Sequence, residues 1–421
     1  MSEKIVFLTD SWIPGFTING IIVKNIIEEL ADTYDIKIIS FRQSRLDEAY
    51  YKNVRIEYLE DYPFYENQIK LKLKENRMPL FQRTFYKMLL YAVRIYSYTC
   101  RQITLTGINF SMAQKAEKRL KKVLSSEHAD YVIAIIAPYD FLHAMHELSA
   151  KYKNTKFIVY QADRFISSEN NGLPFLFGKL RKRRRISYLE ELTQRCYRYY
   201  MTDYLLKEET QYFRNKGIVK RIGFPLIIEK KNDKPLIWNQ TDTECTSFVY
   251  TGSLLKAVRP PDDSFRIIER VFSRLNIKLH YYHRGDCSGT VEKIAEKYPD
   301  HVVNHGTVSA ETAYAAMLNA DILICISTFS GRYVAGKTFD YISTGKPVVF
   351  FYYNSKDINI PYFKKYELAL CLKMKAGNEE RNAEKLCRFI KEKKGKKVPF
   401  SVVKEKFCED TPETAAKKLL C

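Results

Sequence analysis

The segment Ala320–Phe351 has the sequence ADILICISTFSGRYVAGKTFDYISTGKPVVFF. Its two apolar runs, Ile322–Ile326 and Val348–Phe351, predict buried strands. Between them, a loop of small residues leads into a helix, which a Gly-Lys-Pro sequence ends. A strand, a loop, a helix and a second strand within about thirty residues predict a βαβ unit. The segment therefore predicts a parallel sheet whose strands are joined by crossover helices.

The rest of the chain repeats this alternation. Strands are predicted at residues 4–9, 36–40, 131–137, 157–160, 199–202, 247–251, 278–283 and 302–303. The opening of the chain, a strand followed by a loop over 10–20 and a helix, is Rossmann-like but lacks GxGxxG, so the dinucleotide fingerprint is absent. Regular alternation of strands and helices predicts an α/β fold with doubly wound parallel sheets.

The chain length and one short segment predict the domain organisation. At 421 residues the chain exceeds what a single core usually serves, which predicts two domains. The sequence RIGFP at 221–225 is the predicted crossing between them. We expect two Rossmann-like, doubly wound domains, residues 1–222 and 223–401. Residues 402–421 are predicted to form a C-terminal helix that packs back toward the N-terminal domain.

The formal net charge of +20 suits polyanionic partners such as nucleic acid, an acidic membrane face or phosphorylated ligands. Between Lys70 and Lys122, thirteen basic residues stand against two acidic ones, interleaved with aliphatic and aromatic residues. Lys179–Arg185 has six cations in seven residues. Two interpretations stay open: ordinary solvated helix faces, or a surface that rests on anionic lipid or holds a lipid-phosphate substrate. Nuclear localisation is another meaning of such runs, but nothing else in the sequence favours it.

Cysteine usage and hydropathy predict the compartment. The nine cysteines are scattered, odd in number and without a CxxC pair, which argues against a disulfide framework or a zinc site. The apolar run at the N-terminus stops at Asp10 and is predicted to be the first strand rather than a signal peptide. No window approaches the roughly 18 apolar residues of a membrane span. We expect a cytoplasmic protein, or one peripheral on the inner face of the cell membrane.

Candidate ligand-binding residues follow the predicted strands of the second half. Glycines stand at four consecutive strand ends: Gly252, Gly285, Gly306 and Gly331. Loops that enter helix N-termini offer free N–H groups and a positive dipole, which suits a diphosphate. Five cations accompany these loops: Lys256, Arg259, Arg284, Arg332 and Lys337. They could neutralise a diphosphate leaving group without a metal, although each could equally be an ordinary surface cation.

Asp340 stands on the helix directly after the loop of the opening segment. A carboxylate at this place can accept hydrogen bonds from a ribose diol. It could equally be a helix-start charge favoured by the helix dipole, or one member of an i,i+3 ion pair with Lys337.

These segments resemble a known family. FVYTGSLLKAVRP, KLHYYHRGD, HVVNHGTVSAETAYAAMLNADILICIS and GKTFDYISTGKPVV, within residues 247–351, resemble the nucleotide-sugar half of GT-B glycosyltransferases, most closely family 4. FLTDSWIPGFTINGIIVKNIIEEL resembles the family's opening strand and glycine-bearing acceptor loop more weakly. The resemblance implies two domains facing across a cleft and a hexosyltransferase-type reaction. A UDP- or GDP-linked sugar would pass, with retention and without a metal or other cofactor, to a lipid-linked or polysaccharide acceptor.

The resemblance also implies residue roles. Asp340 stands where the family's ribose-binding glutamate lies, and Lys337 would assist departure of the diphosphate. Asp163 stands near a position often held by histidine, which implies a catalytic role, and Asn19 and Gly20 would line the acceptor side. The remaining donor-binding residues would be Gly252, Ser253, Lys256, Arg259, Arg284, Gly306, Val308, Ser327 and Arg332.

Two departures from the family pattern keep different functions open. Arg332 stands where an acidic residue often faces the donor sugar, and Ser253 stands where an arginine is common. A catalytically inactive GT-B binding or scaffold protein is therefore one alternative. A nucleic-acid-binding protein, suggested only by the net charge, is the second; no nucleic acid is expected as a partner of a glycosyltransferase.

Overall fold

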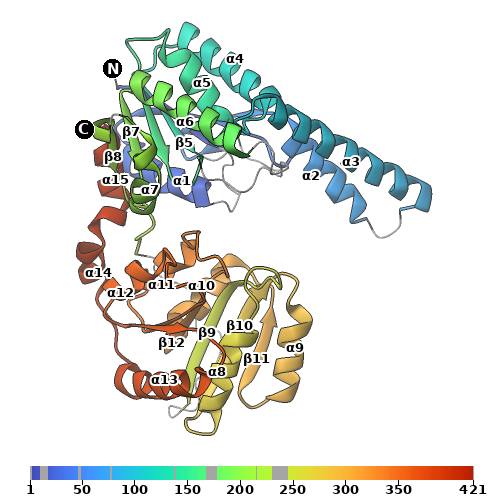
Figure 1. Ribbon diagram of the computed structural model, residues 1–421, viewed down its shortest axis with the longest axis vertical. Helices are drawn as coiled ribbons and strands as arrows, with labels where there is room; N and C mark the ends of the chain where they lie inside the picture. The colour runs from blue at the N-terminus through green and yellow to red at the C-terminus, as the bar shows by residue number, and fades with distance from the viewer. Residues whose placement is uncertain are drawn as a thin grey trace. The chain divides into compact units, whose positions relative to one another are not determined.

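The computed structural model describes residues 2–9, 18–45, 49–75, 78–136, 139–166, 178–214, 216–229 and 245–420. The chain divides into two compact units, Met1–Leu226 with Glu409–Cys421, and Ile227–Cys408 (Figure 1). Each unit is built on a mainly parallel sheet covered by helices, so the predicted fold class is confirmed. The chain first passes from one unit to the other between Leu226 and Ile227, directly after the crossing predicted at 221–225. The chain returns to the first unit at Glu409, after helix α14 (Phe400–Lys406), and α15 (Pro412–Leu420) then contacts α1 (Ile18–Leu30).

The first unit holds an eight-stranded sheet in the order β3-β4-β2-β1-β5-β6-β7-β8. Its strands are β1 (Lys4–Thr9), β2 (Asp35–Phe41), β3 (Tyr50–Tyr51), β4 (Val54–Leu59), β5 (Tyr131–Ile136), β6 (Lys156–Gln161), β7 (Arg198–Met201) and β8 (Val219–Arg221). All neighbours pair in parallel except the short β3, which is antiparallel to β4. The other helices described in this unit are α2 (Tyr62–Leu73), α3 (Leu80–Ile103), α4 (Phe110–Ser126), α5 (Asp140–Ser149), α6 (Gly178–Arg195) and α7 (Asp203–Glu209).

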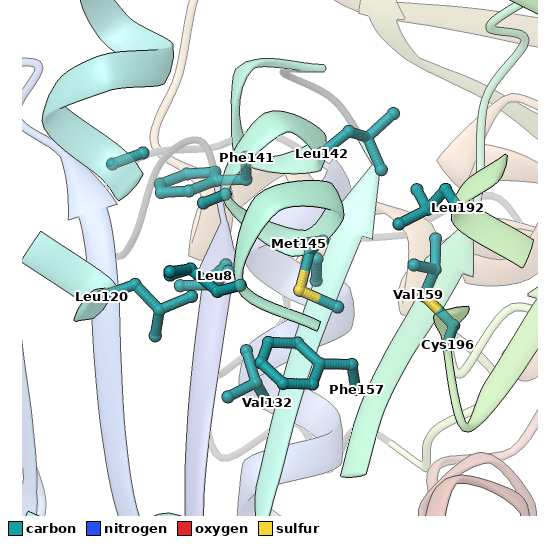
Figure 2. Close-up of a cluster of buried hydrophobic side chains, with 14 of the residues drawn as sticks. Leu8, Leu120, Val132, Phe141, Leu142, Met145, Phe157, Val159, Leu192 and Cys196 are labelled. Atoms are coloured by element: carbon teal, nitrogen blue, oxygen red, sulfur yellow. The ribbon is translucent and has the colours of Figure 1, made fainter. Parts of the chain in front are cut away.

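The core of the first unit lies between its sheet and helices α4, α5 and α6. In Figure 2, Phe141 and Met145 of α5 lie against the strands that carry Leu8, Val132 and Phe157. All five side chains are buried. Strands that are covered on both faces are apolar at nearly every position, which is why the strand runs can be recognised in the sequence.

The second unit holds a six-stranded sheet in the order β11-β10-β9-β12-β13-β14. Its strands are β9 (Thr246–Ser253), β10 (Ile277–Arg284), β11 (Val302–Gly306), β12 (Ile322–Ile326), β13 (Val348–Tyr352) and β14 (Ala369–Lys373). Every pair is parallel, and the order is that of a doubly wound nucleotide-binding sheet, with its switch point between β9 and β12. Its other helices are α8 (Asp262–Phe272), α9 (Ser288–Lys297), α10 (Ala310–Asn319), α11 (Gly336–Ser343), α12 (Ile360–Lys365) and α13 (Glu379–Lys393).

Several elements of the structure were not predicted from the sequence. Residues 352–401 had no predicted element, yet they contain α12, β14 and α13. Strand β14 lies at the sheet edge, and only Leu372 among its five residues is buried. An edge strand needs no continuous apolar run, so its sequence resembles a loop.

The two basic runs have different structures. The described residues between 70 and 122 contribute to three helices, α2, α3 and α4. Lys179–Arg185 lies in α6, where Arg181 and Arg185 are buried and the other four cations are exposed. The run is therefore not a uniformly solvated basic face, because i,i+4 spacing turns two of its arginines inward. Among the described residues, no helix combines the length and apolar character that crossing a bilayer requires.

Candidate functional site

The carboxyl edge of the second unit's sheet collects most of the predicted donor-binding residues. Gly252 and Ser253 end β9, Arg284 ends β10, and Gly306 ends β11. The loops after β9 and β12 meet at the switch point, where the Phe329 amide donates to the Val258 carbonyl at 3.0 Å. Ligands of open α/β sheets bind at this position. The remaining donor-side residues are Lys256 and Arg259 before α8, Val308 before α10, Ser327 and Arg332 before α11, and Lys337 and Asp340 in α11.

The glycine at position 285 is explained by the close approach of two chain segments rather than by the predicted ligand. Its φ is +120°, and a Cβ there would lie 2.1 Å from the carbonyl oxygen of Leu254. The Leu254 amide donates to the Arg284 carbonyl at 2.8 Å, so the loop after β9 crosses directly over this position. The glycine is therefore needed for close approach of two chain segments, and no ligand has to be invoked for it.

Asp357 is a buried residue of this edge that no sequence motif indicates. The Ser327 hydroxyl donates to its carboxylate, and the Asn359 backbone amide donates to it at 2.8 Å. Burial raises the pKa of Asp357 above its usual range, while these hydrogen bonds oppose the rise. A Cβ on Gly331, which has a φ of +61°, would lie 2.8 Å from the same carboxylate. Asp357 therefore holds the loop after β12 from within, and the Ser327 hydroxyl already serves this contact.

Asn359 fixes the start of helix α11. Its side-chain oxygen accepts hydrogen bonds from the Ala335 amide at 3.0 Å and the Thr338 hydroxyl at 3.1 Å. Its side-chain amide donates to the Tyr333 carbonyl at 3.0 Å. Ala335 occupies the N-cap position but has no side chain that can cap. Asn359 supplies this function from elsewhere in the chain, and it orients the helix terminus that the sequence predicts as the diphosphate site.

Lys337 and Asp340 form an ion pair within α11. The Lys337 ammonium lies 3.2 Å from the Asp340 carboxylate, and the two side chains are 36% and 25% exposed. The i,i+3 ion pair that the sequence left open is therefore present. Burial, together with the negative charges of Asp340 and Glu229, raises the pKa of Tyr314 in α10. Both members of the pair are partly open to solvent, so a ligand can reach them.

The predicted cations around β9 and β10 lie in unlike surroundings. The Arg284 Nε donates to the Ser253 hydroxyl at 3.2 Å, which joins two predicted residues. The Arg259 guanidinium lies beside the Tyr250 hydroxyl and limits the rise that burial causes in the pKa of Tyr250, which reaches about 12. The Arg259 Nε is buried and has no hydrogen-bond partner among the described residues. Lys256 lines a groove with residues of α8 and α9.

A histidine pair, His280 and His305, stands beside Gly306, one of the predicted donor-binding residues. His280 Nδ1 and His305 Nε2 are 3.0 Å apart, and the His305 ring stacks on Tyr282 at 4.1 Å between centroids. Burial, with His305 nearby, lowers the pKa of His280 to about 4, so the His280 ring is uncharged at neutral pH. The amide of Gly306 donates to the Asn304 side chain at 3.0 Å. These rings give the turn a rigid, aromatic wall.

The acceptor-side and catalytic predictions fall in the first unit. Asn19 and Gly20 lie in the first turn of α1, where Asn19 is buried, while residues 10–17 of the predicted acceptor loop lie outside the described residues. Asp163 follows β6, and burial raises its pKa. Its carboxylate accepts from the Arg164 amide at 2.7 Å, and Arg164 forms a bidentate pair with Glu208 at 2.7 Å. The structure thus places Asp163 at a carboxyl strand end of its own sheet.

Comparisons with known proteins show the fold and no closer kinship. No protein-family model matches the chain, and no curated protein matches it in sequence. A solved trehalose-6-phosphate phosphatase N-terminal domain from Candida albicans is similar with a TM-score of 0.62 and 12% identity, covering 100% of this chain and 96% of that one. A glycosyltransferase from Rickettsia africae has a TM-score of 0.59 and 12% identity, with coverage of 99% and 96%. A lipopolysaccharide outer core galactosyltransferase has a TM-score of 0.54 and 13% identity, with coverage of 98% and 97%. The chain has the GT-B fold of such proteins. Because proteins named for different activities share this fold, the activity of this chain has to be argued from its site.

Proposed function

We propose that the protein is a glycosyltransferase that moves a sugar from a nucleoside diphosphate to an acceptor hydroxyl. The observation that carries the proposal is the start of α11 at the switch point of the second sheet, with Lys337 and Asp340 in its first turns. Solved glycosyltransferases share the fold over nearly the whole chain, which supports the same assignment.

The donor would bind across the loops after β9 and β12. The free N–H groups at the start of α11 suit the diphosphate, and Lys337 would neutralise the charge that develops on it. Asp340 would accept hydrogen bonds from the ribose hydroxyls. In this proposal, Lys337 and Asp340 pair with each other at 3.2 Å while no donor is bound. When the donor binds, Lys337 contacts the diphosphate and Asp340 contacts the ribose.

The arginines of the neighbouring strand ends would complete the donor site. Arg284, held by the Ser253 hydroxyl, ends the strand next to β9. Arg332 lies on the loop directly before α11. Both could supply positive charge to a departing diphosphate, so the reaction would need no metal. The donor would be UDP- or GDP-linked, and no other cofactor would take part.

The acceptor side is proposed on the resemblance alone. A lipid-linked or polysaccharide hydroxyl would approach from the first unit near Asn19 and Gly20, and it would attack with retention. Asp163, whose pKa burial raises, would have the catalytic role that the resemblance implies. The cytoplasmic location stays a prediction.

A thermal-shift screen with UDP, GDP, UMP and GMP tests the donor site. One nucleoside diphosphate should raise the unfolding temperature, and Asp340→Ala should abolish the shift. Asp263→Ala is the matched control, because Asp263 forms an i,i+3 pair with Arg266 at 2.9 Å on α8. The same loss in both variants, or no shift with any nucleotide, would rule out the proposed donor site.

An inactive binding protein is the second candidate, favoured by Arg332 and Ser253 where the family pattern has an acidic residue and an arginine. Hydrolysis of the donor that gives the largest thermal shift separates the two. Slow release of free sugar, lost in Lys337→Ala, supports the enzyme. Binding without hydrolysis or transfer across a broad acceptor panel supports the binding protein. Salt-sensitive binding of nucleic acid, without any nucleotide-sugar binding, would contradict both.

A further inference from the structure

Helix α3 exposes an apolar stripe that the fold of the first unit does not use. Phe81, Phe85, Met88 and Ile95, here called the α3 stripe, are 83%, 56%, 68% and 49% exposed. Their spacing of four, three and seven residues places them on one face of the helix. Large apolar side chains that gather in this way on a surface usually mark a contact with another molecule or a membrane.

The opposite face of α3 packs against α2, so the stripe points away from its own support. The only fully buried residues of α3 are Ser97 and Cys100. Arg94 pairs with Glu66 of α2 at 3.0 Å. The two helices form a hairpin that extends beyond the sheet of the first unit (Figure 1). The hairpin therefore displays the stripe on its outer side.

The base of the hairpin is anchored by three arginines, of which Arg181 and Arg185 are buried and Arg101 is half-buried. Arg101, near the end of α3, donates to the Tyr62 hydroxyl at 2.9 Å and to the Gly107 carbonyl at 3.0 Å. From α6, Arg181 donates to the Gln102 side chain at 2.6 Å and Arg185 to the Thr106 carbonyl at 2.7 Å. The stripe is thus held on a fixed support instead of a free helix.

The net positive charge of the hairpin favours an anionic partner. Residues 62–75 and 78–103 contain seven basic residues and two acidic ones. Lys74, Arg83 and Lys87 are exposed and have no ion pair among the described residues. A second copy of this chain would bring an equally basic hairpin against the stripe, whereas anionic lipid headgroups would neutralise it.

We propose that the α3 stripe docks the protein on an anionic lipid bilayer, with α3 lying in the interface. At 1.5 Å per residue, the 24 residues of α3 span about 36 Å, and the helix carries too many charges to cross a bilayer. The apolar stripe enters the boundary of headgroups and acyl chains, and its cations contact the headgroups. The tyrosines Tyr91, Tyr96 and Tyr98 suit the same depth. This docking does not depend on sugar transfer.

Co-sedimentation of the full chain with vesicles tests the apolar part. Vesicles of phosphatidylcholine with about 30% phosphatidylglycerol should bind the protein, and pure phosphatidylcholine should bind it far less. Replacing Phe81 and Phe85 by serine should weaken partitioning by about tenfold for each side chain. Because both are exposed, the thermal unfolding of this variant should match that of the parent protein.

The basic part has a matched control on α6. Lys74→Gln with Arg83→Gln and Lys87→Gln should weaken binding by about fivefold for each cation. Lys179→Gln with Arg183→Gln and Arg184→Gln removes the same charge from exposed positions and should have a smaller effect. Equal losses in the two triple variants would show attraction by net charge alone and overturn the proposal.

A tryptophan in the stripe separates lipid from other partners. The emission of the tryptophan introduced by Phe85→Trp should shift to the blue when the anionic vesicles are added. Lipids brominated along the acyl chain should quench this emission. Unchanged emission on bound vesicles would overturn the proposal. So would a dimer, seen by light scattering without lipid, that the two serine substitutions dissociate, because the stripe would then be a contact between copies.

Discussion

Replacing Asp357 by alanine should loosen the loop between β12 and α11. The carboxylate accepts hydrogen bonds from the Ser327 hydroxyl and from the backbone and side-chain amides of Asn359, the latter at 2.8 and 2.9 Å. All three residues are buried, with 4%, 2% and 1% exposed for Ser327, Asp357 and Asn359. Alanine removes these three hydrogen bonds, although two of the donors keep another acceptor: the Ser327 hydroxyl has the Thr328 carbonyl at 3.3 Å and the Asn359 side-chain amide has the Tyr333 carbonyl at 3.0 Å. At about 1 kcal/mol for each hydrogen bond lost, the loop loses about 3 kcal/mol.

Hydrogen exchange measured by mass spectrometry on the full chain reports this loss locally. The amides to follow are those of Gly331, which donates to the Thr328 carbonyl at 3.2 Å, and Ala335, which donates to Asn359. A loss of about 3 kcal/mol in the opening free energy accelerates their exchange roughly a hundredfold. Ser327→Ala removes one bond and should accelerate it about tenfold or less.

Asp357→Asn is the matched control. It keeps the size of the side chain, and the Ser327 hydroxyl can reverse its role and accept from the new amide. Because burial already raises the pKa of Asp357, the loss of its charge removes little stabilisation. Exchange in the asparagine variant should stay within about fivefold of the parent protein. If the alanine variant exchanged no faster than the asparagine variant, the conclusion that Asp357 holds the loop would be wrong.

Three further predictions concern stability. Gly285→Ala places a Cβ against backbone at a positive φ and should lower the free energy of unfolding by more than about 3 kcal/mol in calorimetry, whereas Gly289→Ala, with open space, should be tolerated. Burial raises the pKa of Asp140 to about 6, so the folded state loses roughly 3 kcal/mol as pH rises from about 4 to 6; Asp140→Asn should remove this slope from thermal unfolding curves. The Lys37 ammonium lowers the pKa of Glu127 to about 2, so that pair stabilises the fold above about pH 4.5 and is lost on acidification. Because Glu127 is partly exposed, solvent screening limits the contribution of the Lys37–Glu127 pair to about 1 kcal/mol. Glu127→Gln should therefore reduce the loss of unfolding free energy between about pH 4.5 and pH 2 by no more than about 1 kcal/mol.

The sheets could be predicted because parallel strands that are buried on both faces are apolar at nearly every position. Ile322–Ile326 was predicted to the residue and is β12, with all five side chains buried. The loop and helix after it followed from small residues and a Gly-Lys-Pro stop, which placed Lys337 and Asp340 on α11. These features are local, so a short window contains the information that decides them.

The supports of the site could not be predicted, because their contacts join distant parts of the chain. Ser327 and Asp357 are thirty residues apart, and Asp357 belongs to a loop with no periodic pattern. The role of Gly285 depends on where the loop after β9 passes, which no motif states. A sequence window shows a residue type at a strand end but not whether a ligand or the chain itself occupies the space beside it.

The basic runs show the same difference in the case of charge. A count treats the cations of Lys179–Arg185 alike, but a helix separates positions 181 and 185 from 182, 183 and 184. The inward pair reaches Gln102 and Thr106 at the base of α3. Part of the charge that suggested a membrane surface is therefore used to hold the hairpin, and the exposed apolar face lies on α3 instead. Lipid binding is thus inferred from the residues beside the cations rather than from the number of cations. Cations alone attract any polyanion, whereas cations bordering the exposed apolar α3 stripe suit a surface with both charge and an apolar interior.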